Sequence, residues 1–114
     1  MPITNLTKET LLANSVEIAN TPFKRMRGLL GRTSMKAQEA LIITECNSIH
    51  MFFMKFTIDV VFLNKENKVI GLSKRIKPFE CSPIFWRAVC AVELPEGTIE
   101  ATNTQVGDRL AVSA

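Results

Sequence analysis

The chain has 114 residues, of which 46% are hydrophobic and 22% are charged, and its formal net charge is +3. This length allows one domain, spanning residues 1–114, that can bury about two-thirds of its unfolded surface. The small positive excess argues against a nucleic-acid binder, whose basic residues are usually more numerous and more localised.

The N-terminal segment and the cysteines predict a soluble cytoplasmic protein. The first 15 residues lack the basic and apolar regions of a secretory signal. No uncharged apolar run reaches the ~18 residues that a membrane-spanning helix needs, so we expect no membrane association. Three cysteines at irregular spacing do not form a disulfide framework, and we expect reduced thiols.

The first third of the chain predicts extended segments followed by one helix. Residues 16–19 alternate like a strand. Thr21 and Pro22 then suit a helix N-cap and the first helical position. Apolar residues continue at helical spacing, which predicts a short helix over residues 22–31 that stops at Gly31. The apolar stripe of this helix consists of Phe23, Met26 and Leu30.

The rest of the chain predicts mostly strands. They are expected at residues 40–44, 49–56, 58–64, 68–76, 87–94 and 109–112, with a hairpin turn at 64–67 and a possible second helix near 97–104. Many short strands with one early helix favour a mainly β fold with helical decoration. We predict a compact β-sandwich or β-barrel.

Two carboxylates fall on apolar faces of these strands. Asp59 and Glu93 each have apolar residues two positions away, on the same side of their strand. Because an unpaired buried charge is strongly destabilising, each carboxylate should have a partner. Arg27 lies at the edge of the helical stripe, and its guanidinium fork can serve two carboxylates. We therefore predict that Arg27 turns inward and bridges Asp59, Glu93 or both.

This predicted cluster has two interpretations, which the sequence leaves open. It can be a structural ion network, or it can floor a pocket for a small ligand or a partner peptide beneath the 78–86 loop. Our leading hypothesis is a non-enzymatic binding or accessory module of the second kind. The candidate ligand-binding residues are Arg27, His50, Asp59, Glu93 and Trp86.

Two other functions remain as alternatives. The first is an enzyme that uses His50 or a buried carboxylate, with Cys81 and His50 as one conceivable nucleophile–base pair. A lone histidine on an apolar strand face is, however, more often a hydrogen-bonded core residue. The second alternative is a docking module that presents Phe85 and Trp86 to a protein partner, with an oligomeric state that the sequence does not specify.

The cysteines and the histidine do not favour a metal site. Cys46, His50, Cys81 and Cys90 supply the four ligands of a structural zinc site, but none of the cysteines forms a C-x-x-C pair. Cys90 fits a small apolar residue of a core strand instead. We expect no metal and no cofactor.

Four segments resemble the prokaryotic family called domain of unknown function 192. Arg27-Gly28-Leu29-Leu30-Gly31-Arg32 resembles its R-G-L-M-x-R signature, and Phe53-Met54-Lys55-Phe56-Thr57-Ile58-Asp59-Val60-Val61-Phe62 is similar to its W-M-K-N-T-x-x-P-L-D-I-I-F block. Val92-Glu93-Leu94-Pro95-Glu96-Gly97 and Val106-Gly107-Asp108 resemble its last two blocks. The second segment departs from the family in lacking the tryptophan, the asparagine and the proline. The resemblance implies a β-sandwich or barrel with short helices and a bacterial source, and it brings no catalytic mechanism.

Overall fold

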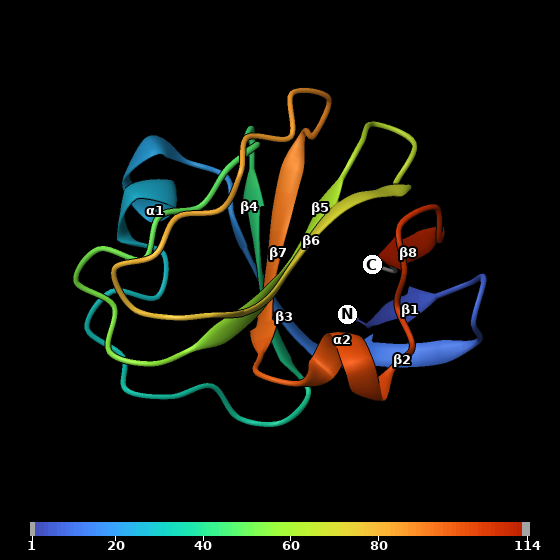
Figure 1. The fold of residues 1–114 in the computed structure, drawn as a ribbon, viewed down its shortest axis with the longest axis horizontal. Coiled ribbons are helices and arrows are strands. Elements are labelled where there is room, and N and C mark those ends of the chain that lie inside the picture. The colour runs from blue at the N-terminus through green and yellow to red at the C-terminus, as the bar shows by residue number, and fades with distance from the viewer. Residues whose placement is uncertain (1, 113–114) are drawn as a thin grey trace.

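The structure, a computed structural model that describes residues 2–112, contains two β-sheets and two short helices (Figure 1). The strands are β1 (Ile3–Asn5), β2 (Thr10–Ala13), β3 (Ser15–Ala19), β4 (Glu39–Thr44), β5 (Ile58–Leu63), β6 (Val69–Ile76), β7 (Cys90–Pro95) and β8 (Leu110–Val112), and the helices are α1 (Pro22–Arg27) and α2 (Thr98–Ala101). The larger sheet has the order β3-β4-β7-β5-β6, and the smaller sheet has the order β2-β1-β8. The predicted mainly β fold is confirmed.

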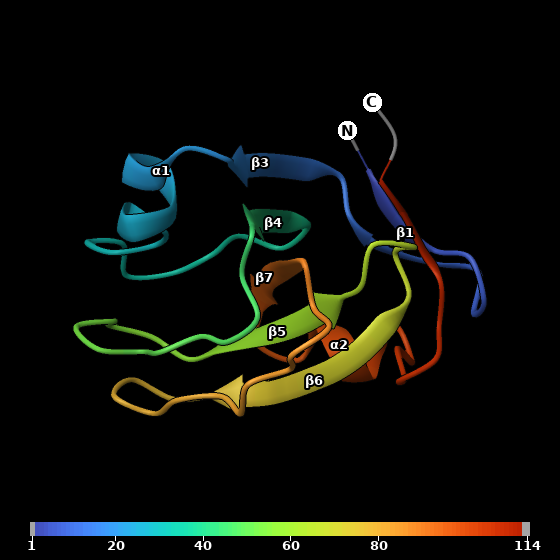
Figure 2. The ribbon, with the colours of Figure 1, turned by 90° about the horizontal axis from the view of Figure 1, so that it is seen from above.

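The larger sheet buries a separate apolar core on each of its two faces. One core lies between the two sheets and includes Ile3 of β1, Val61 of β5 and Leu110 of β8. The other core, which includes Leu29, Ile43 and Phe62, is covered by the α1 region and by loops. Figure 1 shows the small sheet at one end of the molecule and α1 at the other, and Figure 2 shows α1 beside the end of β3. The two cores explain why β5 is buried at all six positions.

Helix α1 lies in the crossover between β3 and β4, which pair in parallel. A parallel pair needs such a crossover because the chain must return to the same end of the sheet. The predicted start of the helix is confirmed: Pro22 occupies the first turn, and the Thr21 side chain accepts a hydrogen bond from the Lys24 backbone N–H at 3.2 Å. The predicted end at residue 31 is wrong, because the helix stops at Gly28, whose φ is +48°.

The apolar stripe predicted for this helix does not face the core. Phe23 and Met26 are 72% and 78% exposed, and α1 contains no buried residue. Leu29, in the turn that follows the helix, is the residue that inserts into the core. The six-residue helix is too short to align the whole stripe with the sheet, because the chain changes direction at Gly28.

Residues 49–56 do not form the predicted strand. They form an irregular loop in which Ile49, Met51 and Met54 are buried, while Phe52 and Phe53 are exposed. Backbone hydrogen bonds tie this loop to the loop that follows β6: Met51 N–H donates to the carbonyl of Glu80 at 2.8 Å, and Phe79 N–H donates to the carbonyl of Met51 at 2.8 Å. The loop therefore has defined pairing without belonging to either sheet.

Among the described residues, no helix has the length and the apolar character needed to cross a bilayer.

A close contact between β6 and the 77–86 loop predicts a strict size limit at Gly71. A Cβ atom at this position would lie 2.3 Å from a ring carbon of Phe85, and that ring packs on Phe62 with centroids 4.6 Å apart. We expect Gly71→Ala to lower the free energy of unfolding by about 1–3 kcal/mol, because the ring must move out of its packed position. Chemical denaturation measures the change. In a Phe85→Ala background the same substitution should cost under ~1 kcal/mol, since the clash is absent. An equal cost in both backgrounds would contradict this account.

Candidate functional site

The two buried carboxylates lie on opposite faces of the larger sheet. The register pairs Asp59 of β5 with Leu94 of β7, and Val60 of β5 with Glu93 of β7. Leu94 belongs to the core between the sheets, whereas Val60 belongs to the core under α1. Asp59 is 1% exposed and Glu93 is 5% exposed, so both are buried as expected. Their opposite orientation means that one side chain cannot bridge them.

The predicted pairing of Arg27 with Asp59 is therefore wrong. The two carboxylate oxygens of Asp59 accept backbone hydrogen bonds at 2.9 Å, one from Arg75 N–H in β6 and one from Ile99 N–H in α2. These bonds satisfy the buried carboxylate, and they attach α2 to the larger sheet. Asp59 is a structural residue in this fold, and it does not line the pocket described below.

This role predicts a large stability cost for Asp59→Asn. Either orientation of the amide places its NH₂ group against one of two backbone N–H donors, so we expect a loss of about 2–3 kcal/mol in the free energy of unfolding. Chemical denaturation at neutral pH provides the measurement. Glu100→Gln is the matched control: Glu100 pairs with the Arg75 side chain on the exposed surface, and loss of such a pair should cost about 1 kcal/mol or less. Equal effects in the two variants would argue against the proposed role of Asp59.

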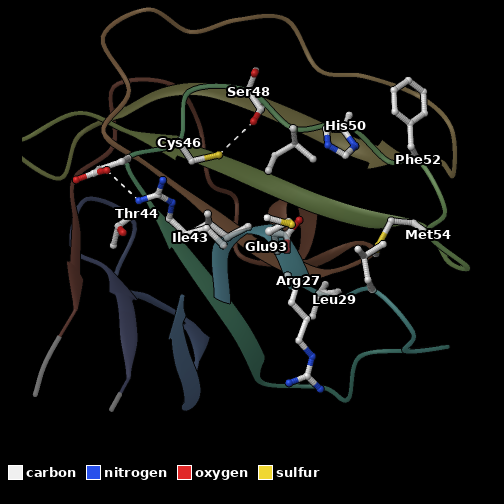
Figure 3. A pocket seen from close by; sticks show the side chains of 16 residues that line it. Arg27, Leu29, Ile43, Thr44, Cys46, Ser48, His50, Phe52, Met54 and Glu93 are labelled. Carbon is white, nitrogen blue, oxygen red and sulfur yellow. Dashed lines mark hydrogen bonds and ion pairs between the residues drawn. The ribbon is translucent and has the colours of Figure 1, made fainter. Parts of the chain in front are cut away.

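A cavity of about 200 Å³ opens on the other face, at the end of the molecule that carries α1. Its walls come from the turn after α1, the end of β4 and the loop at residues 45–54 (Figure 3). The apolar part of the lining consists of Met26, Leu29, Leu30, Ile43, Ile49, Phe52 and Met54. Glu93 is the one residue of β7 in the lining, and it comes from a central strand of the larger sheet. The cavity is thus a mainly apolar pocket with a single buried carboxyl group.

The Glu93 carboxyl is the unusual group of this pocket. Its Oε1 atom is buried and has no hydrogen-bond partner among residues 2–112. Burial raises the pKa of this carboxyl to about 7, because the apolar surroundings disfavour the charged form. A buried polar atom without a partner is rare in folded proteins and calls for a specific explanation. A group shifted in this way within a concave site is a candidate functional residue.

Three polar side chains that line the cavity do not reach the Glu93 carboxyl. Arg25 forms an ion pair with Glu45 at 2.9 Å, and the Cys46 thiol donates to the carbonyl of Ser48 at 3.1 Å. Figure 3 shows the Arg27 guanidinium directed away from the Glu93 carboxyl. Arg27 also lines a second, larger hollow of about 450 Å³ on the other side of the turn. The predicted bridge from Arg27 to Glu93 is absent from the described structure.

Gly28 makes the close approach of the helix turn to Glu93 possible. Its backbone has φ +48° and ψ −126°, a conformation that residues with a Cβ atom rarely adopt. A Cβ atom there would lie 4.0 Å from Glu93 Oε1. Sequence-based reasoning missed Gly28 as a site residue. A glycine within a helical pattern was the available signal, since it often marks a close backbone approach or an early helix end.

His50 lies at the edge of the pocket rather than in the core. The residue is exposed, which corrects the expectation of a buried core histidine, and its ring stacks on Phe52 with centroids 5.2 Å apart. An isolated backbone bridge joins His50 to Cys81. The bridge makes the two residues of the conceivable nucleophile–base pair neighbours, but Cys81 lines a different hollow and no hydrogen bond joins their side chains among residues 2–112.

Two of the cysteines, Cys46 and Cys90, have thiols that are not activated. Burial raises the pKa of the Cys46 thiol, and the nearby Glu93 carboxylate raises it further. Burial also raises the pKa of Cys90 to about 11. Reactive cysteines require the opposite shift, toward the thiolate. Within the part of the chain that the structure describes, no three His, Cys, Asp or Glu side chains are arranged to hold a metal ion.

The aromatic loop after β6 lies outside the pocket. Phe85 is partly buried against Phe62, so it is not presented to a partner as predicted. Trp86 is 80% exposed and does not line the pocket. The structure therefore does not join Trp86 with Glu93 and His50 in one site. Phe79 and Ile84 are the other exposed apolar residues of this loop.

The final Gly-Asp segment is structural. Asp108 is buried, and its carboxylate accepts hydrogen bonds from the side chains of Asn5 and Lys8 and from the Gln105 backbone N–H, at 2.8–2.9 Å. Burial opposes ionisation, but these hydrogen bonds hold the pKa of Asp108 below its usual value. Of the four segments with family resemblance, three therefore meet at the pocket, through Gly28, Met54 and Glu93.

Comparisons with known proteins agree with this fold. The chain is 37% identical over 110 residues to the UPF0127 protein of Thermococcus sibiricus, covering 93% of this chain and 71% of that one. It is 38% identical over 112 residues to the UPF0127 protein of Pyrococcus furiosus, covering 93% of each chain. These relatives are archaeal, so the expected bacterial source is not supported.

Two crystal structures share the fold at low sequence identity. A protein of unknown function from Novosphingobium aromaticivorans superposes with a TM-score of 0.85 at 18% identity, covering 98% of this chain and 84% of that one. A proposed transcription regulator from Sinorhizobium meliloti has a TM-score of 0.75 at 20% identity, covering 96% of this chain and 89% of that one. The family model described as "Uncharacterized ACR, COG1430" matches residues 3–112. The chain therefore belongs to the domain of unknown function 192 family.

Proposed function

We propose that this domain is a binding module whose pocket holds a small ligand that donates a hydrogen bond to Glu93. The observation that carries the proposal is the Oε1 atom of Glu93, which is buried beside the cavity without a partner among residues 2–112. Such an atom is destabilising in the free protein, and a ligand donor removes that cost on binding. A protein that retains a destabilising polar group in a pocket is consistent with selection for binding rather than for stability.

The size of the cavity limits the ligand. Pockets for drug-sized molecules usually measure roughly 300–1,000 Å³. The cavity here is about 200 Å³ and is lined mainly by apolar side chains. It suits a small organic molecule, or one side chain of a partner peptide, with one polar end and a short apolar body.

The proposal is tested by titrating ¹⁵N-labelled protein with three four-carbon probes that differ in charge: butylamine, butan-1-ol and butyrate. We expect at least one probe to shift the amide resonances of Gly28, Leu29 and Ile43 in a saturable manner, since these residues line the cavity. Binding should weaken in Glu93→Gln, provided that the spectrum of the variant shows a folded protein. If none of the probes shifts these resonances at its highest soluble concentration, the proposed function fails.

Arg27→Met is the second variant of this test, because Arg27 is a long cation of the lining that could turn inward. In the structure its guanidinium points away from Glu93, so its removal should leave probe binding and the pKa of Glu93 unchanged (Figure 3). The pKa is read from the carboxyl carbon resonance during a pH titration. A pKa of Glu93 near 4 in the wild type that rises in Arg27→Met would show that Arg27 already fills the role we assign to a ligand.

An enzyme that uses Glu93 is the second candidate, and the pKa of about 7 favours it. A carboxyl that titrates near neutral pH is suited to general acid–base chemistry. His50, at the edge of the same pocket, is the second group that such chemistry could use. Exchange of the α-protons of butan-2-one in D₂O tests this function: faster exchange with wild type than with Glu93→Gln supports an enzyme, and equal rates support a binding module.

A further inference from the structure

We infer that the ligand of this pocket is a small monoamine whose ammonium group donates to Glu93 Oε1 and whose short apolar body lies against Leu29, Ile43 and Met54. This inference rests on the proposed function and adds the chemical class of the ligand. It depends on three properties of the pocket: its donor supply, its charge and its lining.

The donor must come from the ligand. No group among residues 2–112 donates to Oε1, and three donors of the lining are engaged or directed elsewhere: Arg25 with Glu45, the Cys46 thiol with the carbonyl of Ser48, and the Arg27 guanidinium away from Glu93. An ionised carboxylate accepts hydrogen bonds only. A ligand with an N–H or O–H group is therefore required to satisfy Oε1, and a ligand with acceptors alone is not sufficient.

The charge of the pocket selects among such donors. Glu93 is the single buried carboxyl of the lining, and no cation among residues 2–112 pairs with it. A neutral alcohol or amide would supply a hydrogen bond but would leave the buried negative charge without a counter-charge. An ammonium supplies both, and charge-assisted hydrogen bonds of this kind are roughly twice as strong as neutral ones.

The lining and the mouth restrict the rest of the molecule. Leu29, Ile43, Ile49 and Met54 are buried residues of the core under α1, so they offer apolar contact and no polar partner. Four-carbon chains fit a cavity of this volume and gain affinity from each methylene that they bury. Arg25 and Arg27 also line the cavity, and Glu45, the other carboxylate of the lining, is already paired with Arg25, so a second positive charge on the ligand would find no free counter-charge in the lining. A monoamine meets these conditions better than a diamine.

The charged and titratable groups around Glu93 define the expected pH dependence. The α1 region brings Arg25 and Arg27, and the segment after β4 brings Glu45, Cys46 and His50. On the neighbouring strands, Glu93 is paired with the apolar residues Leu41 and Val60. Glu93 is the buried acid of this set, so its ionisation should control the affinity for a cation.

The deciding experiment compares the three probes at two pH values. We expect butylamine to bind at least about tenfold more tightly than butan-1-ol or butyrate at pH 8.5, which is the ratio given by about 1.4 kcal/mol. Because Glu93 titrates at about 7 and an alkylamine stays protonated, the affinity for butylamine should fall about 30-fold from pH 8.5 to pH 5.5. A His50→Gln variant should show the same fall, which separates the carboxyl from the imidazole.

The outcomes separate this inference from the proposed function. If butan-1-ol or butyrate binds as tightly as butylamine, the pocket is a ligand site but the amine class is wrong. The same conclusion follows if the affinity for butylamine rises toward low pH, since protonated Glu93 would then be the binding form. If none of the probes binds, the proposed function fails together with the inference. A loss of butylamine binding in Glu93→Gln, with butan-1-ol binding unchanged, supports the ammonium–carboxylate contact directly.

Discussion

Replacing Glu93 by leucine is expected to raise the free energy of unfolding at pH 8.5 by about 3 kcal/mol, and by much less at pH 4.5. The reason is the pKa of Glu93, which burial raises from 4.5 to about 7 in the folded protein. Between these two values the native state holds a proton that the unfolded state has lost, so the stability of the wild type falls as the pH rises. Well above pH 7 the carboxyl is ionised in both states, and the loss is complete. Leucine has a similar volume and no ionisable group, so the stability of the variant does not fall in this way as the pH rises.

Denaturant unfolding of both proteins from pH 4 to pH 9 measures this difference. Glu66→Leu is the matched control, because Glu66 is exposed in the turn between β5 and β6 and its substitution changes the net charge equally. The free energy of unfolding of Glu66→Leu should change with pH as that of the wild type does, across the whole range. If the free energy of unfolding of Glu93→Leu also has the same pH dependence as the wild type, Glu93 titrates at an ordinary pKa and has a partner in solution. The gain in stability should be accompanied by loss of probe binding, as expected when a functional group lowers stability.

Gly28→Ala is expected to reduce both stability and ligand binding. A residue with a Cβ atom at φ +48° and ψ −126° is strained, which should cost about 1–3 kcal/mol in the free energy of unfolding. The new methyl group would also lie 4.0 Å from Glu93 Oε1, in the space where a ligand donor would have to approach. We therefore expect the affinity for the bound probe to fall about tenfold or more, the equivalent of about 1.4 kcal/mol.

Gly31→Ala separates the two effects of this substitution. Gly31 also has a positive φ, +86°, but a Cβ atom there would meet no atom within 4 Å. Gly31→Ala should lower the free energy of unfolding through backbone strain and leave probe binding close to that of the wild type. Thermal unfolding and the same amide titration provide both readouts. Equal losses of binding in the two variants would mean that strain in the turn, rather than access to Glu93, controls the pocket.

The local features of this protein could be predicted from the sequence. Thr21 and Pro22 predicted the start of α1, and the apolar segment after residue 58 predicted β5, because caps and strand patterns depend on neighbouring residues. The burial of Asp59 and Glu93 followed from their apolar neighbours within each strand. Sequence resemblance identified the family.

The segment before β5 could not be predicted in this way. Residues 49–56 are as apolar as a buried strand, but their backbone groups pair with the loop that follows β6, about 30 residues later. That loop also supplies the Ser82 hydroxyl, which accepts from Ile49 N–H at 2.8 Å. The composition of a short segment does not show which distant segment will satisfy its backbone. The position of His50 and Phe52 at the mouth of the pocket depends on this pairing.

The sequence by itself determined a mainly β fold with two buried carboxylates and an early capped helix. Only the tertiary structure decided that Asp59 is satisfied by the backbone of β6 and α2, while Glu93 lies beside a cavity without a partner among residues 2–112. The physical reason is strand register. Alternation along a strand fixes which residues share a face, but hydrogen bonding between β5 and β7 fixes how the faces of the two strands correspond. A shift of one residue would reverse that correspondence, and no pattern within either strand specifies it.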